Sequence, residues 1–439
     1  MTHVFYRAPN VTMPLAVGGE GIYVIDDSGR RYLDSCSGVA VSSLGYNHPG
    51  AIAALQQQAS TLAYAYGGVF RNQAAEDLAD FLIARSPNMS HAYFLSSGSE
   101  IMEIALKTAF QYFVELGKPQ RRLVISRRQN YHGSTLGVLT VSGNVQRRDI
   151  FDPVLAAPHY VSPCYAYRNQ AANETEADYV QRLANELEAK ILELGADNVA
   201  AFVAETVVGS TSGAVPPVKG YFQAMRKVCD QYGVLLILDE VMCGMGRTGH
   251  LFACAEDEVV PDILTIGKGL AAGYQPISAM LVGAHIHEAI ASGSGMLRNG
   301  QTFAFHATAC ATALAVQHII EEENLLANVQ RRGEQLRGLL RETFAEHPNV
   351  GDVRGRGLFV GVELVADRLS KQPLPPSQNL AARIRPLAME AGMMSYPLGG
   401  TIDGKHGDHV LFAPPFIVSE SEIEQIVAIF AKVLNKALG

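Results

Sequence analysis

The chain has 439 residues, of which 48% are hydrophobic and 18% charged, and its formal net charge is −8 at pH 7. This composition is typical of a globular enzyme large enough for two domains. The charges form no basic stripe, which argues against a nucleic-acid partner. We find no apolar stretch of membrane-spanning length and no apolar leader, so we expect no membrane partner and a cytoplasmic location.

The first predicted element is a β-hairpin. Residues 22–26 and 31–34 read as strands, and the turn between them contains Gly29, which can adopt a positive φ. From about residue 50 to 310, helical patterns such as 100–116 and 221–232 alternate with short apolar runs. The predicted strands are 91–95, 122–126, 199–205, 233–238, 262–266 and 277–282. This alternation predicts an α/β fold with a mostly parallel central sheet covered by helices.

The last part of the chain has a different pattern. A long helical stretch after residue 310 precedes a strand at 357–364, a proline-rich loop at 367–378 and a final helix that opens at the capping box Ser419-Glu420-Ser421-Glu422. We predict a smaller α+β domain built from both chain ends. The predicted boundaries give residues 1–55 as its N-terminal part, 56–310 as the large domain and 311–439 as its C-terminal part.

Asp239 and Lys268 are the most informative pair of residues. The apolar run 233–238 ends in Asp239, and the run 262–266 ends in Gly267-Lys268-Gly269. Two buried strands that end in a carboxylate and in a lysine suit pyridoxal phosphate. The lysine would form the Schiff base, and the carboxylate would keep the ring nitrogen protonated so that the ring accepts electrons.

Two further segments follow predicted strands. Ser96-Ser97-Gly98-Ser99-Glu100 opens a helix, where free N–H groups and the helix dipole favour a phosphate. Taken alone, this segment favours a serine cap without a ligand, and the presence of the Asp239 and Lys268 pair reverses that preference. Tyr131-His132-Gly133 places an aromatic ring where it could stack on a flat heteroaromatic ring, although a buried tyrosine is the alternative.

Other patterns fit their usual ligands poorly. Gly244-x-Gly246-x-x-Gly249 has the spacing of a dinucleotide loop, but no helical pattern follows it, so we expect a glycine-rich loop beside the ligand. Gly267-Lys268-Gly269 lacks the Ser or Thr of a Walker A loop. His285-x-His287 and 406–409 lack the spacing of a metal site, so we expect no metal. The six cysteines are scattered, and we expect reduced, buried thiols.

Together these stretches resemble the class III pyridoxal-phosphate aminotransferases of the ω-amino acid:pyruvate type, over nearly the whole chain. The most specific motif is Leu238-Asp239-Glu240-Val241 followed by Gly246-Arg247-Thr248-Gly249 and Lys268-Gly269-Leu270. Residues 44–49, Gln301-Thr302-Phe303, 353–358 and 413–415 resemble further family motifs. The resemblance implies fold type I architecture, pyridoxal 5'-phosphate as cofactor, and a homodimer or a dimer of dimers.

The resemblance also implies a role for each site residue. Lys268 and Asp239 would be catalytic, Lys268 as Schiff-base lysine and general base and Asp239 as the partner of the pyridinium. Tyr131 and Val241 would cover the two faces of the ring, and Glu205 and His132 would shape the pocket. The phosphate would be held by Ser97, Gly98, Ser99 and the partner subunit's Thr302.

The expected reaction moves an amino group from an amine or ω-amino acid donor to a keto acid such as pyruvate by a ping-pong mechanism. Many relatives carry an arginine for the substrate carboxylate where this chain has Gly404 or Lys405, and lysine lacks the bidentate fork. We therefore expect acidic groups on the donor to matter less, unless Lys405, Arg354 or another basic residue replaces that arginine. The alternatives are a same-family racemase, aminomutase or decarboxylase and, more remotely, a nicotinamide-dependent dehydrogenase or a cofactor-free structural protein.

Overall fold

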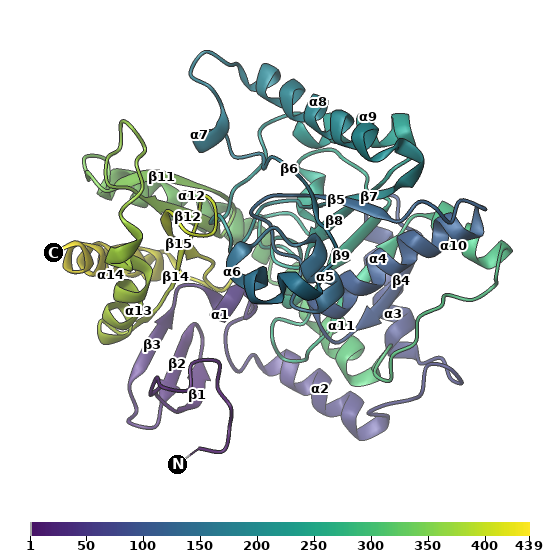
Figure 1. Ribbon diagram of the computed structural model, residues 1–439. Helices are drawn as coiled ribbons and strands as arrows, with labels where there is room; N and C mark the ends of the chain where they lie inside the picture. Colours follow the sequence, from purple (N-terminus) through teal and green to yellow (C-terminus); the bar gives the residue numbers. More distant parts are fainter. Residues whose placement is uncertain (1) are drawn as a thin grey trace.

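A seven-stranded sheet forms the centre of the larger part of the protein (Figure 1). The computed structural model describes residues 2–439. The strand order is β4-β10-β9-β8-β7-β5-β6. β10 runs in the opposite direction to the other six described strands of this sheet. The strands are β4 (His91–Leu95), β5 (Leu123–Arg127), β6 (His159–Val161), β7 (Val199–Glu205), β8 (Leu235–Glu240), β9 (Ile263–Ile266) and β10 (Ser278–Val282).

The mostly parallel sheet predicted from the sequence is confirmed. Six of its seven strands lie within two residues of the predicted bounds. The sequence misses β6 because it is only three residues long, lies at the sheet edge and has no apolar run.

Helices cover both faces of this sheet (Figure 1). Every residue of β7 and β8 is buried, which explains why these strands read as continuous apolar runs. Helix α4 (Gly98–Glu115) packs on the face that carries Leu235 and Ile237. Helices α8 (Glu176–Leu194) and α9 (Tyr221–Tyr232) pack on the face that carries Leu236 and Leu238. Because side chains alternate along a strand, Asp239 belongs to the α4 face and Glu240 to the opposite one.

The smaller part of the protein combines both chain ends. The N-terminal hairpin of β2 (Tyr23–Asp26) and β3 (Arg31–Asp34) is confirmed, and β3 pairs in parallel with β13 (Met393–Met394) from the C-terminal region. Ile22 and Leu33 share one apolar core with the C-terminal elements, so the predicted union of the two ends is correct. The remaining strands are β1 (Ala16–Glu20), β11 (Val350–Arg356), β12 (Phe359–Leu364), β14 (Tyr396–Gly399) and β15 (Asp408–Phe412).

The predicted domain boundaries at residues 55 and 310 stay a prediction. They fall inside two helices, α2 (Pro49–Thr61) and α11 (Ala307–Glu322), which pack against each other. The predicted capping box opens α14 (Glu420–Leu438), where the Ser419 side chain accepts from the Glu422 N–H. The other helices are α1 (Ser37–Ala40), α3 (Gln73–Arg85), α5 (Leu136–Val141), α6 (Val145–Arg148), α7 (Ala166–Asn169), α10 (Ala284–Ser292), α12 (Leu325–Thr343) and α13 (Leu380–Glu390).

Two further observations concern membrane-spanning helices and the state of the cysteines. Within residues 2–439, no helix is both long and apolar enough to cross a membrane. All six cysteines are buried free thiols, as predicted.

Candidate active site

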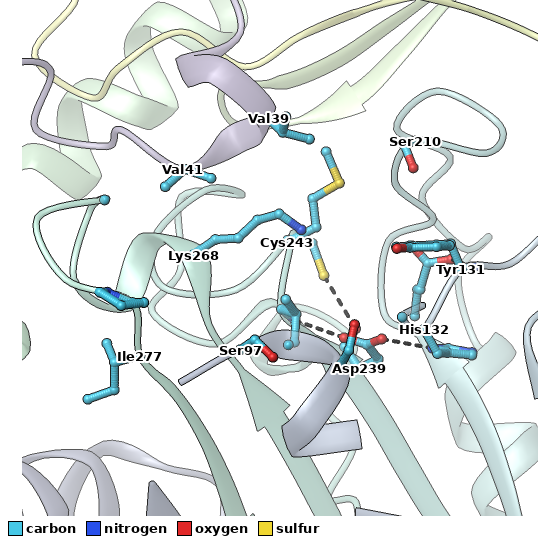
Figure 2. A pocket seen from close by; sticks show the side chains of 18 of the residues that line it. Val39, Val41, Ser97, Tyr131, His132, Ser210, Asp239, Cys243, Lys268 and Ile277 are labelled. Carbon is cyan, nitrogen blue, oxygen red and sulfur yellow. Dashed lines mark hydrogen bonds and ion pairs between the residues drawn. The ribbon is translucent and has the colours of Figure 1, made fainter. Parts of the chain in front are cut away.

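The main cavity lies at the carboxyl ends of β7, β8 and β9 and encloses about 590 Å³. In a mostly parallel sheet these strand ends meet at one edge, which is where such folds bind ligands. Nine of the ten predicted site residues line the cavity: Ser97, Gly98, Ser99, Tyr131, His132, Glu205, Asp239, Val241 and Lys268. Thr302 does not line it. Figure 2 shows Lys268 and Tyr131 on opposite sides of the cavity, with Asp239 and His132 below them.

Lys268 presents a free amine to this cavity. Its Nζ has no hydrogen bond or ion pair with any residue in the described part of the chain. The backbone at Lys268 has a φ of 44°, a left-handed conformation that costs energy for a residue with a Cβ. Burial lowers the pKa of Lys268, and the negative charges of Asp239 and Glu205 partly oppose that effect. An amine with a lowered pKa is more often in the nucleophilic, uncharged form.

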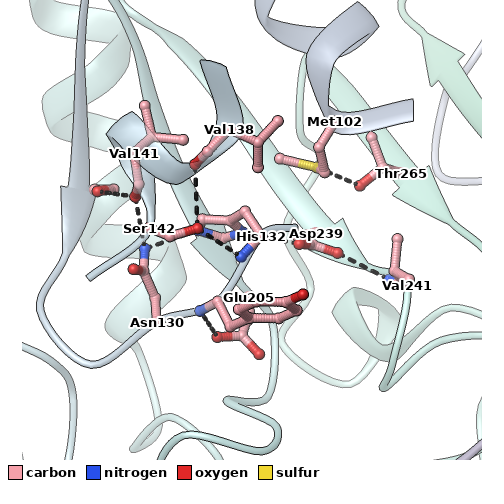
Figure 3. Close-up of polar contacts among 12 residues, drawn as sticks. Met102, Asn130, His132, Val138, Val141, Ser142, Glu205, Asp239, Val241 and Thr265 are labelled. Carbon is pink, nitrogen blue, oxygen red and sulfur yellow. Dashed lines mark hydrogen bonds and ion pairs between the residues drawn. The ribbon is translucent and has the colours of Figure 1, made fainter. Parts of the chain in front are cut away.

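Asp239 is held by two donors at the base of the cavity (Figure 3). Its Oδ2 lies 2.8 Å from Nδ1 of His132, and its Oδ1 accepts the Val241 N–H at 2.9 Å. Asn130 fixes the proton on His132: its Oδ1 accepts the Gly143 N–H, so its amide nitrogen faces Nε2 of His132 at 2.8 Å. Nε2 is therefore an acceptor, and Nδ1 carries the proton that is donated to Asp239.

Two buried glutamates near Asp239 have different tasks. Glu205, the last residue of β7, accepts the Tyr131 N–H at 3.0 Å and the Gly209 N–H at 2.8 Å. It thereby fixes the backbone beneath the Tyr131 ring, and burial raises its pKa. Glu240 points to the other face of the sheet, where its side chain accepts from the backbone of residues 253 and 254. Only Glu205 reaches the cavity.

The N-terminus of α4 forms the anion-binding part of the cavity. Ser97 caps this helix by accepting the Glu100 N–H, and Ser99 accepts the Ser134 N–H at 3.0 Å. The N–H groups of Gly98 and Ser99 have no acceptor in residues 2–439, as expected for the first turn of a helix. A Cβ at Gly98 would lie 2.8 Å from Cγ1 of Val241, so only glycine fits here. These free N–H groups and the helix dipole suit a phosphate.

Thr302, the loop 244–249 and Lys405, which the sequence suggested as parts of the site, do not line the cavity. Thr302 is exposed, and its carbonyl accepts a hydrogen bond from the Tyr64 hydroxyl at 2.7 Å. The loop 244–249 opens no helix and does not line the cavity, although its Met245 packs against Gly269, the residue after Lys268. Gly246 packs on the smaller domain, where a Cβ would meet Leu326 and Phe416, whereas Gly244 packs on Glu240 of β8. Lys405 is exposed and lies outside the cavity.

The structure also brings in residues that the sequence analysis missed. These cavity residues come from loops and short elements: Arg7, Val39, Val41, Arg147, Ser210, Met242, Cys243 and Tyr396. Their local sequence has no strand-end pattern, so only the folded chain could identify them. Among residues 2–439, no group of three or more His, Cys, Asp or Glu side chains could hold a metal ion.

The class III aminotransferase family matches residues 6–434 of this chain. The chain belongs to this family. An uncharacterized aminotransferase of Schizosaccharomyces pombe is 42% identical over 439 residues, which cover 100% of this chain and 96% of that protein. A diaminobutyrate–2-oxoglutarate transaminase of Halomonas elongata is 36% identical over 95% of this chain and 89% of that protein. The crystal structure of an omega transaminase from Pseudomonas jessenii in complex with PMP is similar with a TM-score of 0.93 and 36% identity, over 100% of this chain and 96% of that one.

Pyridoxal phosphate is the cofactor of this class III aminotransferase. The residues present fit it at three places: the free N–H groups of α4 suit the phosphate, the carboxylate of Asp239 suits the ring nitrogen, and the amine of Lys268 suits the carbonyl carbon. The dehydrogenase alternative has no such support. After Gly249 only the short turn Ala253–Ala255 precedes β9, and a dinucleotide loop requires a helix there.

The lowered pKa of Lys268 leads to a testable pH dependence. Only the uncharged amine attacks the cofactor carbonyl, so the rate of cofactor attachment to the apo aminotransferase should rise with pH. We expect its midpoint below the ordinary lysine value of 10.5 because burial disfavours the ammonium form. Asp239→Asn should move the midpoint lower still, because the Asp239 charge favours the ammonium form. Stopped-flow absorbance after mixing with pyridoxal phosphate measures both. A midpoint at or above 10.5 would contradict the burial argument.

Proposed function

We propose that this aminotransferase moves an amino group from an amine or ω-amino acid to a keto acid such as pyruvate by a ping-pong mechanism. The observation that carries the proposal is the unpaired Lys268 amine, which enters the same cavity as the α4 N-terminus and the Asp239 carboxylate. A lysine used only for structure would have its charge paired or in water. Similar proteins named diaminobutyrate–2-oxoglutarate transaminase and omega transaminase support a donor with an amine away from the carboxylate.

The roles of the site residues follow from their positions. When bound, pyridoxal phosphate supplies a protonated ring that accepts the electron pair of the substrate C–H bond. Lys268 Nζ attaches the cofactor and then carries the proton away from the substrate carbon. Asp239 would keep the ring nitrogen protonated, and His132 donates to Asp239 and thereby orients its side chain. Ser97, Gly98 and Ser99 would hold the phosphate, and Tyr131 and Val241 would pack against the ring.

The direct test separates transamination from the racemase, aminomutase and decarboxylase alternatives. The purified holoenzyme is mixed with one amine donor in the absence of any keto acid. We expect one carbonyl product per active site and conversion of the cofactor to its amino form, which pyruvate then reverses. Catalytic carbonyl-free isomerisation or carbon dioxide release under these conditions would refute the proposal. The cytoplasmic location remains a prediction.

We further propose that the active unit is a homodimer or a dimer of dimers, with Thr302 reaching the partner's phosphate site. Thr302 is followed by Phe303, and the segment that begins at Tyr64 contains Val69 and Phe70; these three apolar side chains have exposed fractions of 58%, 69% and 65%. An exposed apolar surface usually marks a protein–protein contact. The Tyr64–Thr302 hydrogen bond joins the two segments that carry these side chains.

Thr302→Ala should weaken cofactor retention about threefold to thirtyfold, because one hydroxyl donor to the phosphate is lost. Fluorescence titration of the apo protein with pyridoxal phosphate measures the dissociation constant. Thr61→Ala, which removes an exposed helix-end hydroxyl, is the matched control. An active monomer in sedimentation velocity at the assay concentration would refute the dimer.

A further inference from the structure

Arg147 is a cation in the active-site cavity without a partner. It belongs to the short helix α6, lines the same cavity as Lys268 and is half-buried. Its guanidinium lies 5.5 Å from the ring centroid of Tyr131. Within residues 2–439 the guanidinium makes no hydrogen bond and no ion pair. The next residue, Arg148, is fully engaged, since it pairs with Asp152 at 2.7 Å and donates to the carbonyl of Ser142 at 3.0 Å.

The position of Arg147 is set by its neighbours on both sides. Val145 packs against the loop between β14 and β15, where a Cβ at Gly404 would lie 2.8 Å from Cβ of Val145. Gln146 donates to the carbonyl of Gly399 at 3.4 Å, and Arg148 anchors the other end of α6. The contact between Tyr131 and the Arg147 guanidinium adds a favourable cation–π attraction that leaves its N–H groups free.

No anion of the cavity is available to Arg147. Glu205 accepts two backbone N–H groups, and Asp239 is bound by His132 and the Val241 N–H. The other positive side chains that line the cavity are Arg7 and Lys268. A half-buried guanidinium without a counter-ion loses hydration without compensation, so an arriving anion is favoured there.

We propose that Arg147 binds the carboxylate of the substrate, in particular that of the keto acid acceptor and of the amino acid formed from it. This proposal rests on the proposed transaminase function. Arginine is suited to the task because its planar fork binds both carboxylate oxygens at once. Lys405 cannot take this role from its exposed position, and Arg354 is engaged with Glu363 at 2.7 Å and with Asp352. The carboxylate-binding cation therefore comes from α6 and not from the loop before β15.

The test uses the holoenzyme and glutarate, an unreactive dicarboxylate. Isothermal titration should show that Arg147→Gln weakens glutarate binding about tenfold to a hundredfold, the usual effect of losing a charge-assisted pair. Arg147→Lys should recover part of the loss, because the charge is kept without the fork. Arg128→Gln is the matched control, because Arg128 is exposed and outside the cavity. The dissociation constant of pyridoxal phosphate should be unchanged in all three variants.

The activity assay gives an independent readout. In Arg147→Gln, kcat/KM should fall by a similar factor for pyruvate and 2-oxoglutarate but by less than about threefold for butanal, which has no carboxylate. Equal losses for butanal and pyruvate, an unchanged glutarate affinity, or a loss of cofactor affinity in Arg147→Gln would overturn the proposal. A loss of glutarate binding in Arg7→Gln alone would overturn it in favour of Arg7. If glutarate binding depends on Arg147 while no amino transfer occurs, the proposed function fails and the carboxylate site stands.

Discussion

Lys268→Ala should abolish turnover, with a loss of more than about 10⁴-fold in kcat, because one amine both attaches the cofactor and moves the substrate proton. No other amine lines the described cavity, since Arg7 and Arg147 carry guanidinium groups, which do not form a Schiff base. Steady-state assays with an amine and pyruvate measure the loss, and the absorbance of the purified variant reports whether cofactor is attached.

The Lys268→Ala variant should still bind the cofactor, since the free N–H groups at the α4 N-terminus, where we expect the phosphate, remain in place. Added methylamine should restore a small part of the activity by supplying an external base. Lys118→Ala, which changes an exposed lysine outside the cavity, should keep full activity and serves as the control. More than a few per cent of wild-type activity without added amine would show that Lys268 is not the Schiff-base residue.

Asp239→Asn should lower kcat about 10²-fold to 10³-fold while changing cofactor affinity much less. A neutral amide cannot stabilise a protonated ring nitrogen, so the loss falls mainly on the transition state. The local geometry adds to this effect. The carboxylate of Asp239 accepts from both His132 and the Val241 N–H, and an amide in either orientation would turn its NH₂ group toward one of these donors.

Measured kcat and the cofactor dissociation constant together test the role of Asp239. Asp77→Asn is the control, because Asp77 is an exposed carboxylate on α3 outside the cavity. His132→Phe should give a smaller loss than Asp239→Asn, because it removes a donor to Asp239 but leaves the charge. A near-normal kcat for Asp239→Asn would mean that another group meets the ring nitrogen.

Much of the fold could be predicted because a strand that is buried on both faces of its sheet has a recognisable sequence pattern. Strands β7 and β8 are wholly buried and therefore consist of continuous apolar runs, whose ends mark Glu205 and Asp239. β6 does not show this pattern, since an edge strand of three residues needs no continuous apolar run. The pairing of β3 with β13 joins residues about 360 positions apart, and only the tertiary structure could specify its register.

The candidate site likewise has residues that could be predicted from the sequence and residues that could not. Residues at strand ends and at the α4 N-terminus were predicted, because those positions have local sequence signals. The loop 244–249 does not line the cavity, and the sequence could not show this, because glycine spacing indicates a close approach of the backbone but does not identify the neighbour. Here the neighbours are side chains such as Leu326 and Phe416 of the smaller domain.

The sequence by itself determined the family and the cofactor, because both depend on short segments of fixed order, and it predicted Lys268 and Asp239 as the catalytic pair. The tertiary structure decided which side chains face the cavity from elsewhere in the chain. His132 donates to Asp239, which lies 107 positions later in the chain, and Arg147 reaches the cavity because α6 packs on the loop before β15. Such contacts join segments far apart in sequence, and their geometry exists only once the apolar core has fixed the elements in space.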